Sequence, residues 1–259
     1  MKCSDIIAVI ERDYPPKMAE EWDNPGLLVG RSDREVDTVV TALDATDEVV
    51  DFAVSSRAQM LFTHHPLIFG AVKKINDGDF LGRRILKLIE NGISYYAAHT
   101  NYDVCRMADL NEMQLGLNDT EILLVTDDEG TPAGIGRVGL LQEPMTLRQL
   151  AQRVRSAMDI ESVRCFGNDD PVIRRVAVSG GSGRSVVSLA VEKGAEVLIT
   201  GDIDHHTGID ALACGLHIID AGHYGTEHCF IHDAAERLRA ACPGLTVIEA
   251  DQKEPFFIL

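Results

Sequence analysis

Short β-branched segments alternate with helix-length amphipathic segments in the first hundred residues of the chain. Strands are predicted at 36–43, 59–63 and 93–98, and helices at 48–58 and 81–91 separate them. Strands and helices that alternate in this way are typical of an α/β fold built around parallel strands. We therefore expect consecutive βαβ units in this part of the chain.

A longer amphipathic pattern lies further along, at 146–158. Its apolar residues recur with helical spacing, at Leu147, Leu150, Ala151, Val154 and Met158. Thr146 and Gln149 stand in the positions of a capping box, in which each side chain bonds the backbone amide of the other residue. The pattern predicts a helix that begins just after Thr146.

The chain also resembles itself. The segments at 39–41 and 58–63 recur 137 positions later, and the segment that begins at Gly92 recurs 123 positions later. Unrelated βαβ units share composition, which is the alternative explanation, but we infer a duplication. We expect a first α/β repeat at 1–126 and a second at 127–259. The boundary is expected in the stretch 127–136, which is rich in Gly, Asp and Thr.

The charge balance excludes several classes of protein. Acidic residues outnumber basic ones by 41 to 24, and the formal net charge is −17. A surface of this charge repels nucleic-acid phosphates and anionic lipid, so we expect neither as a partner. The sequence shows no apolar run of the length of a membrane span or signal peptide, which favours the cytoplasm. The six cysteines form no C-x-x-C pair and are expected to be free thiols.

Side chains of the types that bind metal ions gather where predicted strands end. They lie in three loops that begin at residues 64, 99 and 222. Open α/β sheets bind ligands beyond the carboxyl ends of their strands, so we expect these loops to converge on one pocket. The candidate ligands are His64, His65, Asp103, His223 and Glu227.

The spacing of these side chains suits a pair of ions. His64 and His65 are adjacent in an extended segment and point to opposite sides, so they are suited to reach two different ions. His223 and Glu227 are four residues apart at a helix start and lie on one face. A mixed set of imidazoles and carboxylates suits Fe, Mn, Zn, Ni or Co rather than Ca²⁺ or Mg²⁺. A solvated histidine pair and a helix start with a compensating charge are the alternative interpretations.

Six motifs of the chain together resemble the Nif-three-like dinuclear metal-centre family, which includes the GTP cyclohydrolase 1 type 2 homologs. The resemblance runs from near residue 19 to the C-terminus, and Pro25 is the one departure, where the family more often has a small aliphatic residue. The motifs are WDNPGLLVG at 22–30, THHPL at 63–67, AHTNYD at 98–103, SGGSG at 179–183, TGD at 200–202 and DAGHYGTE at 220–227.

The resemblance implies two intertwined, duplicated α/β repeats with mixed sheets, and a toroidal homohexamer. It also implies two divalent metal ions, of which one is held by His65, Asp103 and Glu227 and the other by His64 and His223. Glu227 bridges the two ions in this assignment. A bridging carboxylate holds two cations close enough for both to polarise one water molecule.

Further candidates lie in loops that are expected to border the pocket. We interpret His99 and His206 as catalytic groups that transfer protons, with the orientation of ligands by hydrogen bonds as the alternative role. Gly180, Gly181, Ser182 and Gly183 follow a predicted strand, and their backbone amides are candidates for anion binding, with a tight turn as the alternative. Tyr102 and Tyr224 are the aromatic residues next to the candidate ligands in the sequence.

The sequence therefore favours a metal-dependent hydrolase that acts on a small-molecule substrate. If the resemblance extends to activity, the substrate is GTP, and the guanine imidazole ring is opened by hydrolysis with release of formate. A metal-binding or partner-binding protein without turnover is the alternative from another class. A metal-dependent phosphoesterase is a further alternative, and the negative charge argues against its acting on nucleic acid.

Overall fold

The computed structural model describes residues 1–127, 132–167 and 170–259. The chain falls into two compact units, each with its own sheet. Unit 1 comprises Met1–Tyr102 and Phe230–Lys253, and unit 2 comprises Asp103–Cys229 and Glu254–Leu259. The boundary expected at 127–136 includes the adjoining ends of two paired strands of unit 2, and its residues 128–131 lie outside the described residues. The assignment of two repeats to 1–126 and 127–259 stays a prediction.

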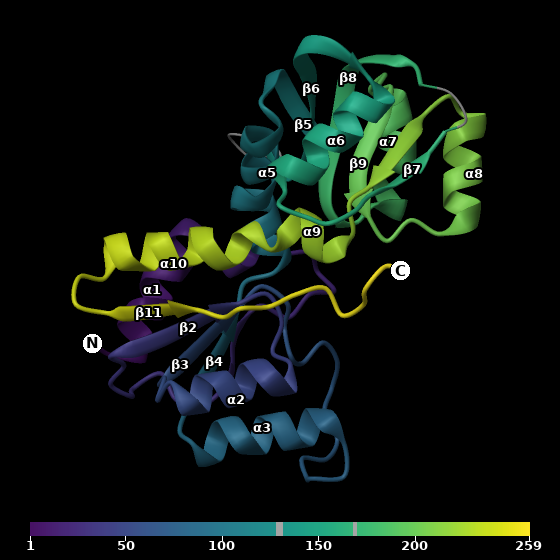
Figure 1. The fold of residues 1–259 in the computed structure, drawn as a ribbon. Helices are drawn as coiled ribbons and strands as arrows, with labels where there is room; N and C mark the ends of the chain where they lie inside the picture. The colour runs from purple at the N-terminus through teal and green to yellow at the C-terminus, as the bar shows by residue number, and fades with distance from the viewer. Residues whose placement is uncertain (128–131, 168–169) are drawn as a thin grey trace. The chain divides into compact units, whose positions relative to one another are not determined.

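Unit 1 is a five-stranded mixed sheet with the order β1-β4-β3-β2-β11. Strands β2, β3, β4 and β11 are parallel, and β1 is antiparallel to β4 (Figure 1). Its strands are β1 (Gly26–Val29), β2 (Thr38–Ala42), β3 (Met60–Thr63), β4 (Ser94–Ala97) and β11 (Thr246–Glu249). Its helices are α1 (Cys3–Asp13), the 3₁₀ turn Pro16–Met18, α2 (Asp47–Ser55), α3 (Phe80–Glu90), α4 (Thr100–Tyr102) and α10 (Cys229–Ala241), whose first residue belongs to unit 2.

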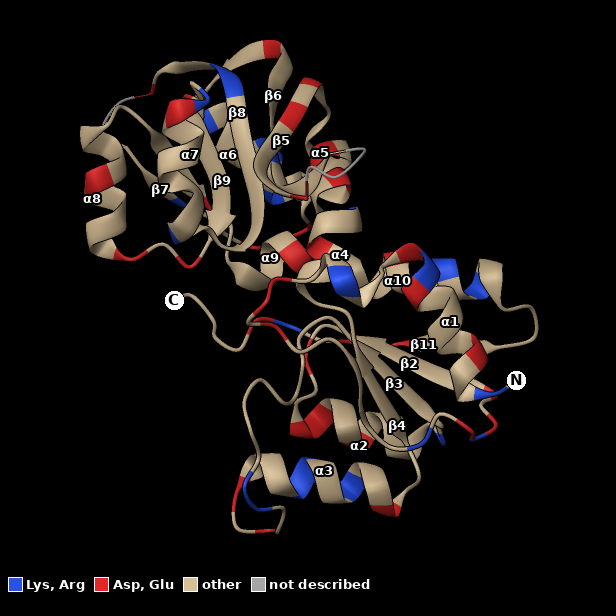
Figure 2. Ribbon diagram, turned by 180° about the vertical axis from the view of Figure 1, so that it is seen from behind, with Lys and Arg blue, Asp and Glu red and all other residues tan. Residues whose placement is uncertain are grey.

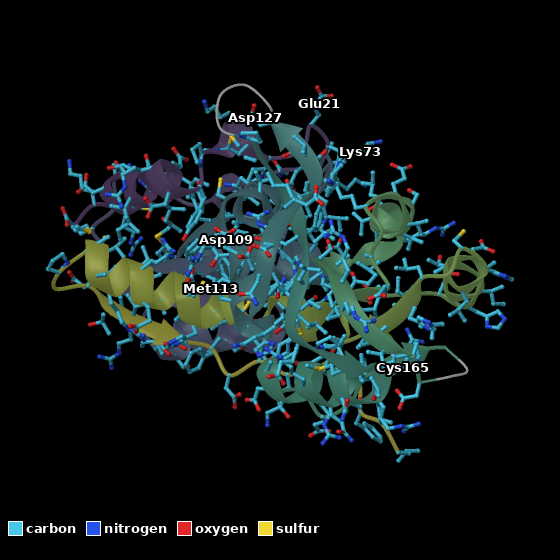
Figure 3. The ribbon with its side chains drawn as sticks, turned by 90° about the horizontal axis from the view of Figure 1, so that it is seen from above. Glu21, Lys73, Asp109, Met113, Asp127 and Cys165 are labelled. Carbon is cyan, nitrogen blue, oxygen red and sulfur yellow. The ribbon has the colours of Figure 1, made fainter. Side chains whose placement is uncertain are left out.

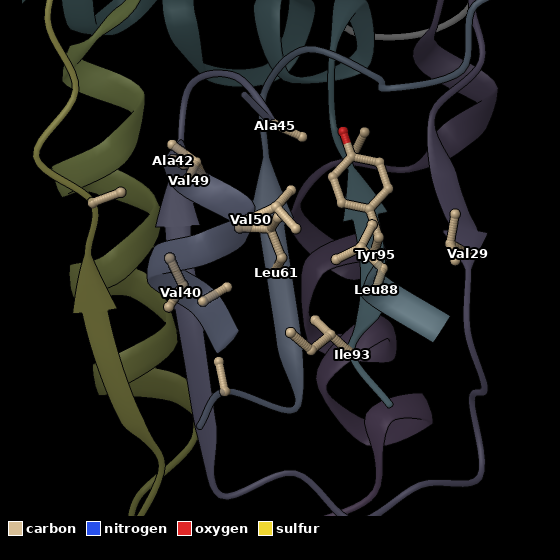
Figure 4. Packing of buried hydrophobic residues seen from close by; sticks show 14 of the residues in the cluster. Val29, Val40, Ala42, Ala45, Val49, Val50, Leu61, Leu88, Ile93 and Tyr95 are labelled. Atoms are coloured by element: carbon tan, nitrogen blue, oxygen red, sulfur yellow. The ribbon is translucent and has the colours of Figure 1, made fainter. Parts of the chain in front are cut away.

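Helices α2 and α3 cover one face of this sheet. Successive residues of a strand point to opposite faces, so only alternate residues of β2, β3 and β4 meet these helices. Val40, Leu61 and Tyr95 are fully buried there against Val50 of α2 and Leu88 of α3 (Figure 4). Each buried aliphatic side chain of this kind contributes about 1.5–3 kcal/mol relative to exposure.

The opposite face of the sheet packs against α1 and α10. The rings of Phe62 in β3 and Phe230 in α10 meet at 5.2 Å, and the Tyr96 hydroxyl donates to Glu11 of α1 at 3.1 Å. Thr41 donates through Oγ1 to the carbonyl of Ile231 at 3.1 Å. Segments from both ends of the sequence therefore complete this unit.

Charged side chains join α2 to α3 at the surface. Arg84 of α3 binds Asp47 of α2 at 2.7 Å, and Lys87 binds Asp51 one turn further along. Figure 2 shows the basic residues of α3 in blue. Exposed pairs of this kind contribute about 0–1 kcal/mol, so the apolar faces of the two helices hold them in place.

Unit 2 is a six-stranded mixed sheet with the order β5-β6-β8-β9-β10-β7. Strands β8, β9 and β10 are parallel, and β5, β6 and β7 pair antiparallel with their neighbours. Its strands are β5 (Leu117–Asp127), β6 (Ala133–Thr146), β7 (Arg164–Phe166), β8 (Val172–Ser182), β9 (Val197–Gly201) and β10 (His217–Asp220). Its helices are the π-helical turn Asp103–Met107, α5 (Ala108–Leu115), α6 (Leu147–Ala157), the 3₁₀ turn Gly183–Val186, α7 (Val187–Glu192), α8 (His205–Ala213) and α9 (His223–Glu227).

Two apolar clusters cover the two faces of this second sheet. Val197 and Ile199 of β9 pack toward α5 and α6, whereas Leu198 between them packs toward α7 and α8. All three side chains are fully buried. A strand buried on both faces is typical of the parallel centre of an α/β sheet.

The two sheets repeat one another in register. Val39 pairs with Met60 in the first sheet and Val176 pairs with Val197 in the second, and both partners are displaced by the same 137 positions. The third strand of each sheet follows with an offset of 123, because Met60 pairs with Ser94 in the first sheet and Val197 pairs with His217 in the second. The strand registers of the two sheets therefore show the same two offsets as the sequence repeat.

The predicted elements are confirmed, with bounds that differ by a few residues. The strands expected at 36–43, 59–63 and 93–98 are β2, β3 and β4, and the helices expected between them are α2 and α3. Helix α6 begins after Thr146 with the predicted capping box, in which Gln149 N–H donates to Thr146 Oγ1 at 3.3 Å.

Two negative expectations concern membranes and disulfides. Within the described ranges, no helix has the length and apolar character that crossing a bilayer requires. The six cysteines are free thiols, as expected, and Cys165 is exposed at the surface (Figure 3).

Candidate metal centre

Three histidines gather at the carboxyl edge of the parallel strands of unit 1. His64 and His65 directly follow β3, and His99 follows the neighbouring strand β4. Each offers one ring nitrogen, and these three atoms lie within 4.8 Å of one another. His64 is fully buried and the other two are half-buried. The predicted location at the strand ends therefore holds within unit 1.

The Nδ1 atom of each of these histidines is held by an oxygen. The bonds run from His64 to the Ala98 carbonyl, from His65 to Asp44 Oδ1 and from His99 to Asp23 Oδ1, each at 2.8 Å. A carbonyl or an ionised carboxylate only accepts, so Nδ1 carries the proton and Nε2 carries the lone pair. This is the arrangement in which protein histidines bind metal through Nε2.

Asp23 is the most constrained of these acceptors. Its side chain is fully buried, and it also accepts bonds from the Thr100 amide at 3.0 Å and the Thr100 hydroxyl at 2.5 Å. Burial alone would raise the pKa of Asp23, but the bonds from His99 and Thr100 outweigh it and hold the pKa well below its ordinary value. The carboxylate therefore stays ionised and fixes the His99 ring.

Tyr95 positions the loop that carries His64 and His65. Its hydroxyl donates to the His65 carbonyl at 2.8 Å and accepts from the Leu67 amide at 2.8 Å, and it lies 2.6 Å from Thr63 Oγ1. Burial raises the pKa of Tyr95 well above its ordinary value, so the hydroxyl keeps its proton. The loop is thus tied at two backbone groups to a buried side chain of β4.

Unit 2 contributes His223 and Glu227, at the two ends of α9. His223 Nε2 lies 3.1 Å from Glu227 Oε2, and Nδ1 lies 2.7 Å from Asp202 Oδ2. Burial lowers the pKa of His223, but Glu227 and Asp202 outweigh it and raise the pKa to about 9. A cation bound at this imidazole and carboxylate would replace the proton that they share.

The glycine run of β8 makes room for Glu227. A Cβ atom on Gly181 would lie 2.5 Å from Glu227 Oε1, and one on Gly180 would lie 3.3 Å from its Cγ. Gly181 also has a φ of +62°, which favours glycine. The Gly181 amide donates to Thr226 Oγ1 at 3.0 Å, so it is already engaged. Anion binding by Gly180, Gly181, Ser182 and Gly183 stays a prediction.

Asp103 opens the π-helical turn Asp103–Met107 of unit 2. Its side chain is half-buried. Single π-helical turns are rare and are frequent at functional sites. His206, by contrast, is exposed in the first turn of α8, where its amide bonds Asp204 and its ring lies 5.4 Å from the ring of His205. A catalytic role for His206 stays a prediction.

The sequence did not single out Asp23 and Asp44, which hold His99 and His65. Asp44 follows the carboxyl end of β2, so the strand-end rule that located the histidines could have found it. Asp23 precedes the sheet, and its partner lies 76 positions away. The local pattern carries no signal for a contact of that separation.

The chemistry of the donors fits a transition metal. Each unit presents imidazole nitrogens whose opposite ring atom is fixed, and unit 2 adds carboxylate oxygens. Such mixed nitrogen and oxygen sets bind Fe, Mn, Zn, Ni or Co. The residues present are therefore compatible with the divalent ions expected from the sequence.

Known proteins resemble this chain over nearly its whole length. A family model described as Duf34/NIF3 (NGG1p interacting factor 3) matches residues 1–255. A GTP cyclohydrolase 1 type 2 homolog of Clostridium acetobutylicum is 37% identical over 243 residues, which cover 93% of this chain and 91% of the relative. A protein of the same name from Clostridium perfringens is 33% identical over 267 residues and 99% of both chains. The fold matches the crystal structure of a Bacillus cereus protein related to NIF3 with a TM-score of 0.93, 28% identity and coverage of 100% and 99%.

Proposed function

Because the chain belongs to the Duf34/NIF3 family, we propose that it binds two divalent metal ions and uses them to hydrolyse a small-molecule substrate, with GTP as the first candidate. One observation carries the proposal most directly. Four histidines, His64, His65, His99 and His223, each have Nδ1 held by an oxygen. This arrangement orients Nε2 toward a metal and raises its basicity.

The proposed ligands combine side chains of both units. His65, Asp103 and Glu227 would hold one ion and His64 and His223 would hold the other, with Glu227 shared between the two. The support is the motif resemblance together with the local geometry in each unit. In unit 2 the glycine at position 181 leaves space beside Glu227 that a larger residue would fill.

Bound divalent ions supply a Lewis acid and lower the pKa of water, which is the chemistry that hydrolysis near neutral pH requires. The residues of the chain supply orientation and proton transfer. Asp23 holds the His99 ring at 2.8 Å, so His99 is placed to exchange a proton through Nε2. His206 is the second candidate for proton transfer in this proposal.

The test is turnover by protein of known metal content. Purified protein is loaded with Fe, Mn, Zn, Ni or Co, the bound metal is counted by mass spectrometry, and formate release from GTP is followed. Glu227→Gln is expected to lower the bound metal and to abolish formate release. Glu192→Gln, an exposed residue of α7 in the same unit, is the matched control and is expected to leave both unchanged. Formate release that survives Glu227→Gln contradicts the proposed site.

The same assay separates the alternatives. Tight metal binding without release of formate or phosphate from a panel of nucleotides favours a metal-binding or partner-binding protein. Release of phosphate alone favours a phosphoesterase. The word homolog in the relatives' names leaves their own activity open, so the assay and not the name decides.

Assembly into a homohexamer stays part of the proposal. Light scattering of the eluting protein at two concentrations tests it, and a mass of six chains is the expected result.

A further inference from the structure

Two large aromatic side chains lie exposed beside the histidines of unit 1. The Trp22 ring contacts the His99 ring at a centroid distance of 5.8 Å and an angle of 77°, and Phe69 contacts the same ring at 5.7 Å and 84°. Trp22 is 62% exposed and Phe69 is 54% exposed. Both rings therefore keep surface that packing against His99 does not cover.

The segment 22–24 anchors the backbone next to both aromatic residues. Asp23, next to Trp22, is anchored to His99 and Thr100, and the amide of Asn24 donates through Nδ2 to the Ile68 carbonyl at 2.6 Å. Ile68 immediately precedes Phe69. One short segment thus ties the backbone beside Phe69 to the residue that holds His99. An aromatic surface that is already ordered loses less entropy when it binds a ligand.

The aromatic residues that the sequence placed beside the ligands are less suited to meet a substrate. Tyr102 is fully buried, and its hydroxyl donates to Asp233 at 2.7 Å. Tyr224 stacks on the ring of His228 at 4.8 Å and 11°. Trp22 and Phe69 combine exposure with contact to a histidine of the site.

We propose that Trp22 and Phe69 form a stacking platform that binds the planar heteroaromatic ring of the substrate, a purine base being the class that fits. The inference rests on the proposed function, because the platform places the ring beside the histidines at which hydrolysis is proposed. A net charge of −17 works against binding energy from substrate phosphates. The platform instead takes its binding energy from stacking of the base on aromatic side chains, which needs no phosphate contact.

Trp22 is itself the probe, because it is the only tryptophan of the chain. Its fluorescence is followed in Zn²⁺-loaded protein, since Zn²⁺ is diamagnetic, during titration with guanosine, GTP or inorganic tripolyphosphate. Saturable quenching by guanosine and GTP, and none by tripolyphosphate, is the expected result. Quenching by tripolyphosphate together with none by guanosine overturns the proposal.

Phe69→Ala and Phe80→Ala form the matched pair of variants. Phe80 is 57% exposed in the same unit but lies at the start of α3, under the guanidinium of Arg84. Phe69→Ala is expected to raise the Kd for guanosine about tenfold, and Phe80→Ala is expected to leave it unchanged. Trp22→Leu, measured by calorimetry, is expected to weaken guanosine binding to a similar extent, and circular dichroism verifies the fold. Equal affinities in all these proteins overturn the platform.

A second copy of the chain is the competing occupant of this surface. Trp22 emission that shifts on dilution, with no response to guanosine, overturns the proposal in favour of a subunit interface.

The binding and turnover assays distinguish a failure of the platform from a failure of the proposed hydrolysis. Guanosine binding that depends on Phe69, without formate release, retains the platform and rejects hydrolysis. Formate release with the same KM in Phe69→Ala and wild type retains hydrolysis and rejects the platform.

Discussion

Asp202 holds the Nδ1 atom of His223 at 2.7 Å while its own backbone lies in the left-handed region, with a φ of +56°. Residues other than glycine adopt this conformation uncommonly, and Asp is among those that tolerate it best. Asp202 directly follows β9, and the next residues lead into α8. The carboxylate is therefore aimed at His223 by a strained turn at the end of the strand.

Asp202→Asn is expected to weaken metal binding. The variant replaces a charged acceptor of the His223 proton with a neutral amide that can present either oxygen or nitrogen. Loss of such a partner typically costs about 10–100-fold in metal affinity. Competitive titration with a chelator measures the effect, and Asp210→Asn, on the exposed side of α8, is the control. Equal affinities in the two variants would show that Asp202 does not support the site.

Gly181→Ala tests the space beside Glu227. A left-handed alanine costs about 1–2 kcal/mol, and the overlap of its Cβ with Glu227 adds about 1–3 kcal/mol. Gly194→Ala is the control. It has only the cost of the left-handed conformation, because Gly194 has a φ of +67° and no neighbouring atom within 4 Å of the added Cβ. Urea unfolding is expected to show the larger loss for Gly181→Ala, with reduced metal content. A common loss for both variants would show that Glu227 moves aside freely.

Tyr95→Phe is expected to destabilise unit 1 and to loosen the loop that carries His64. The change leaves the half-buried Leu67 amide without its hydroxyl acceptor, at a cost of about 1–3 kcal/mol. Tyr96→Phe is the matched control, because the hydroxyl of Tyr96 donates to the Glu11 carboxylate and the structure shows no bond from it to the loop of His64 and His65. The free energies of unfolding in urea compare the two. Metal content is expected to fall only in Tyr95→Phe.

The low pKa of Asp204 predicts how the stability of helix α8 changes in acid. Bonds from the Thr207 hydroxyl and the Thr207 and His206 amides lower the pKa of Asp204 to about 2. Because the folded pKa is depressed, the contribution of this cap is complete above the ordinary value of 3.8 and is lost as the pH falls through about 2. Carbon NMR of the carboxyl group measures the midpoint. Thr207→Val is expected to move it upward, and an unmoved midpoint would contradict the assigned cause.

The fold followed from the sequence because its signals are local or repeated. Strands β2 and β3 and helix α6 are each specified by hydrophobic spacing within a few residues. The offsets of 137 and 123 positions recur in the strand registers, where a slip by one residue would turn buried side chains such as Leu61 and Leu198 to the wrong face.

The carboxylates that hold the histidines of the site could not be predicted from the sequence. Asp23 meets His99 over 76 positions and Asp44 meets His65 over 21, so no periodicity links the partners. The exposure of Trp22 could not be predicted from the sequence either, because tryptophan side chains are on average highly buried in folded proteins. These relationships arise from packing, which a single sequence does not display.

The pairing of β11 with β2 sets the order in which the chain can finish folding during synthesis. Thr246 lies beside Thr38, so the edge of β2 stays uncovered until translation has passed Glu249. An uncovered strand edge is a template for pairing with another chain. Every strand of unit 2 precedes β11 in the sequence and is therefore synthesised before it. All strands of the second sheet are thus synthesised before the last strand of the first, and a chain that ends before residue 246 leaves the edge of β2 open to aggregation.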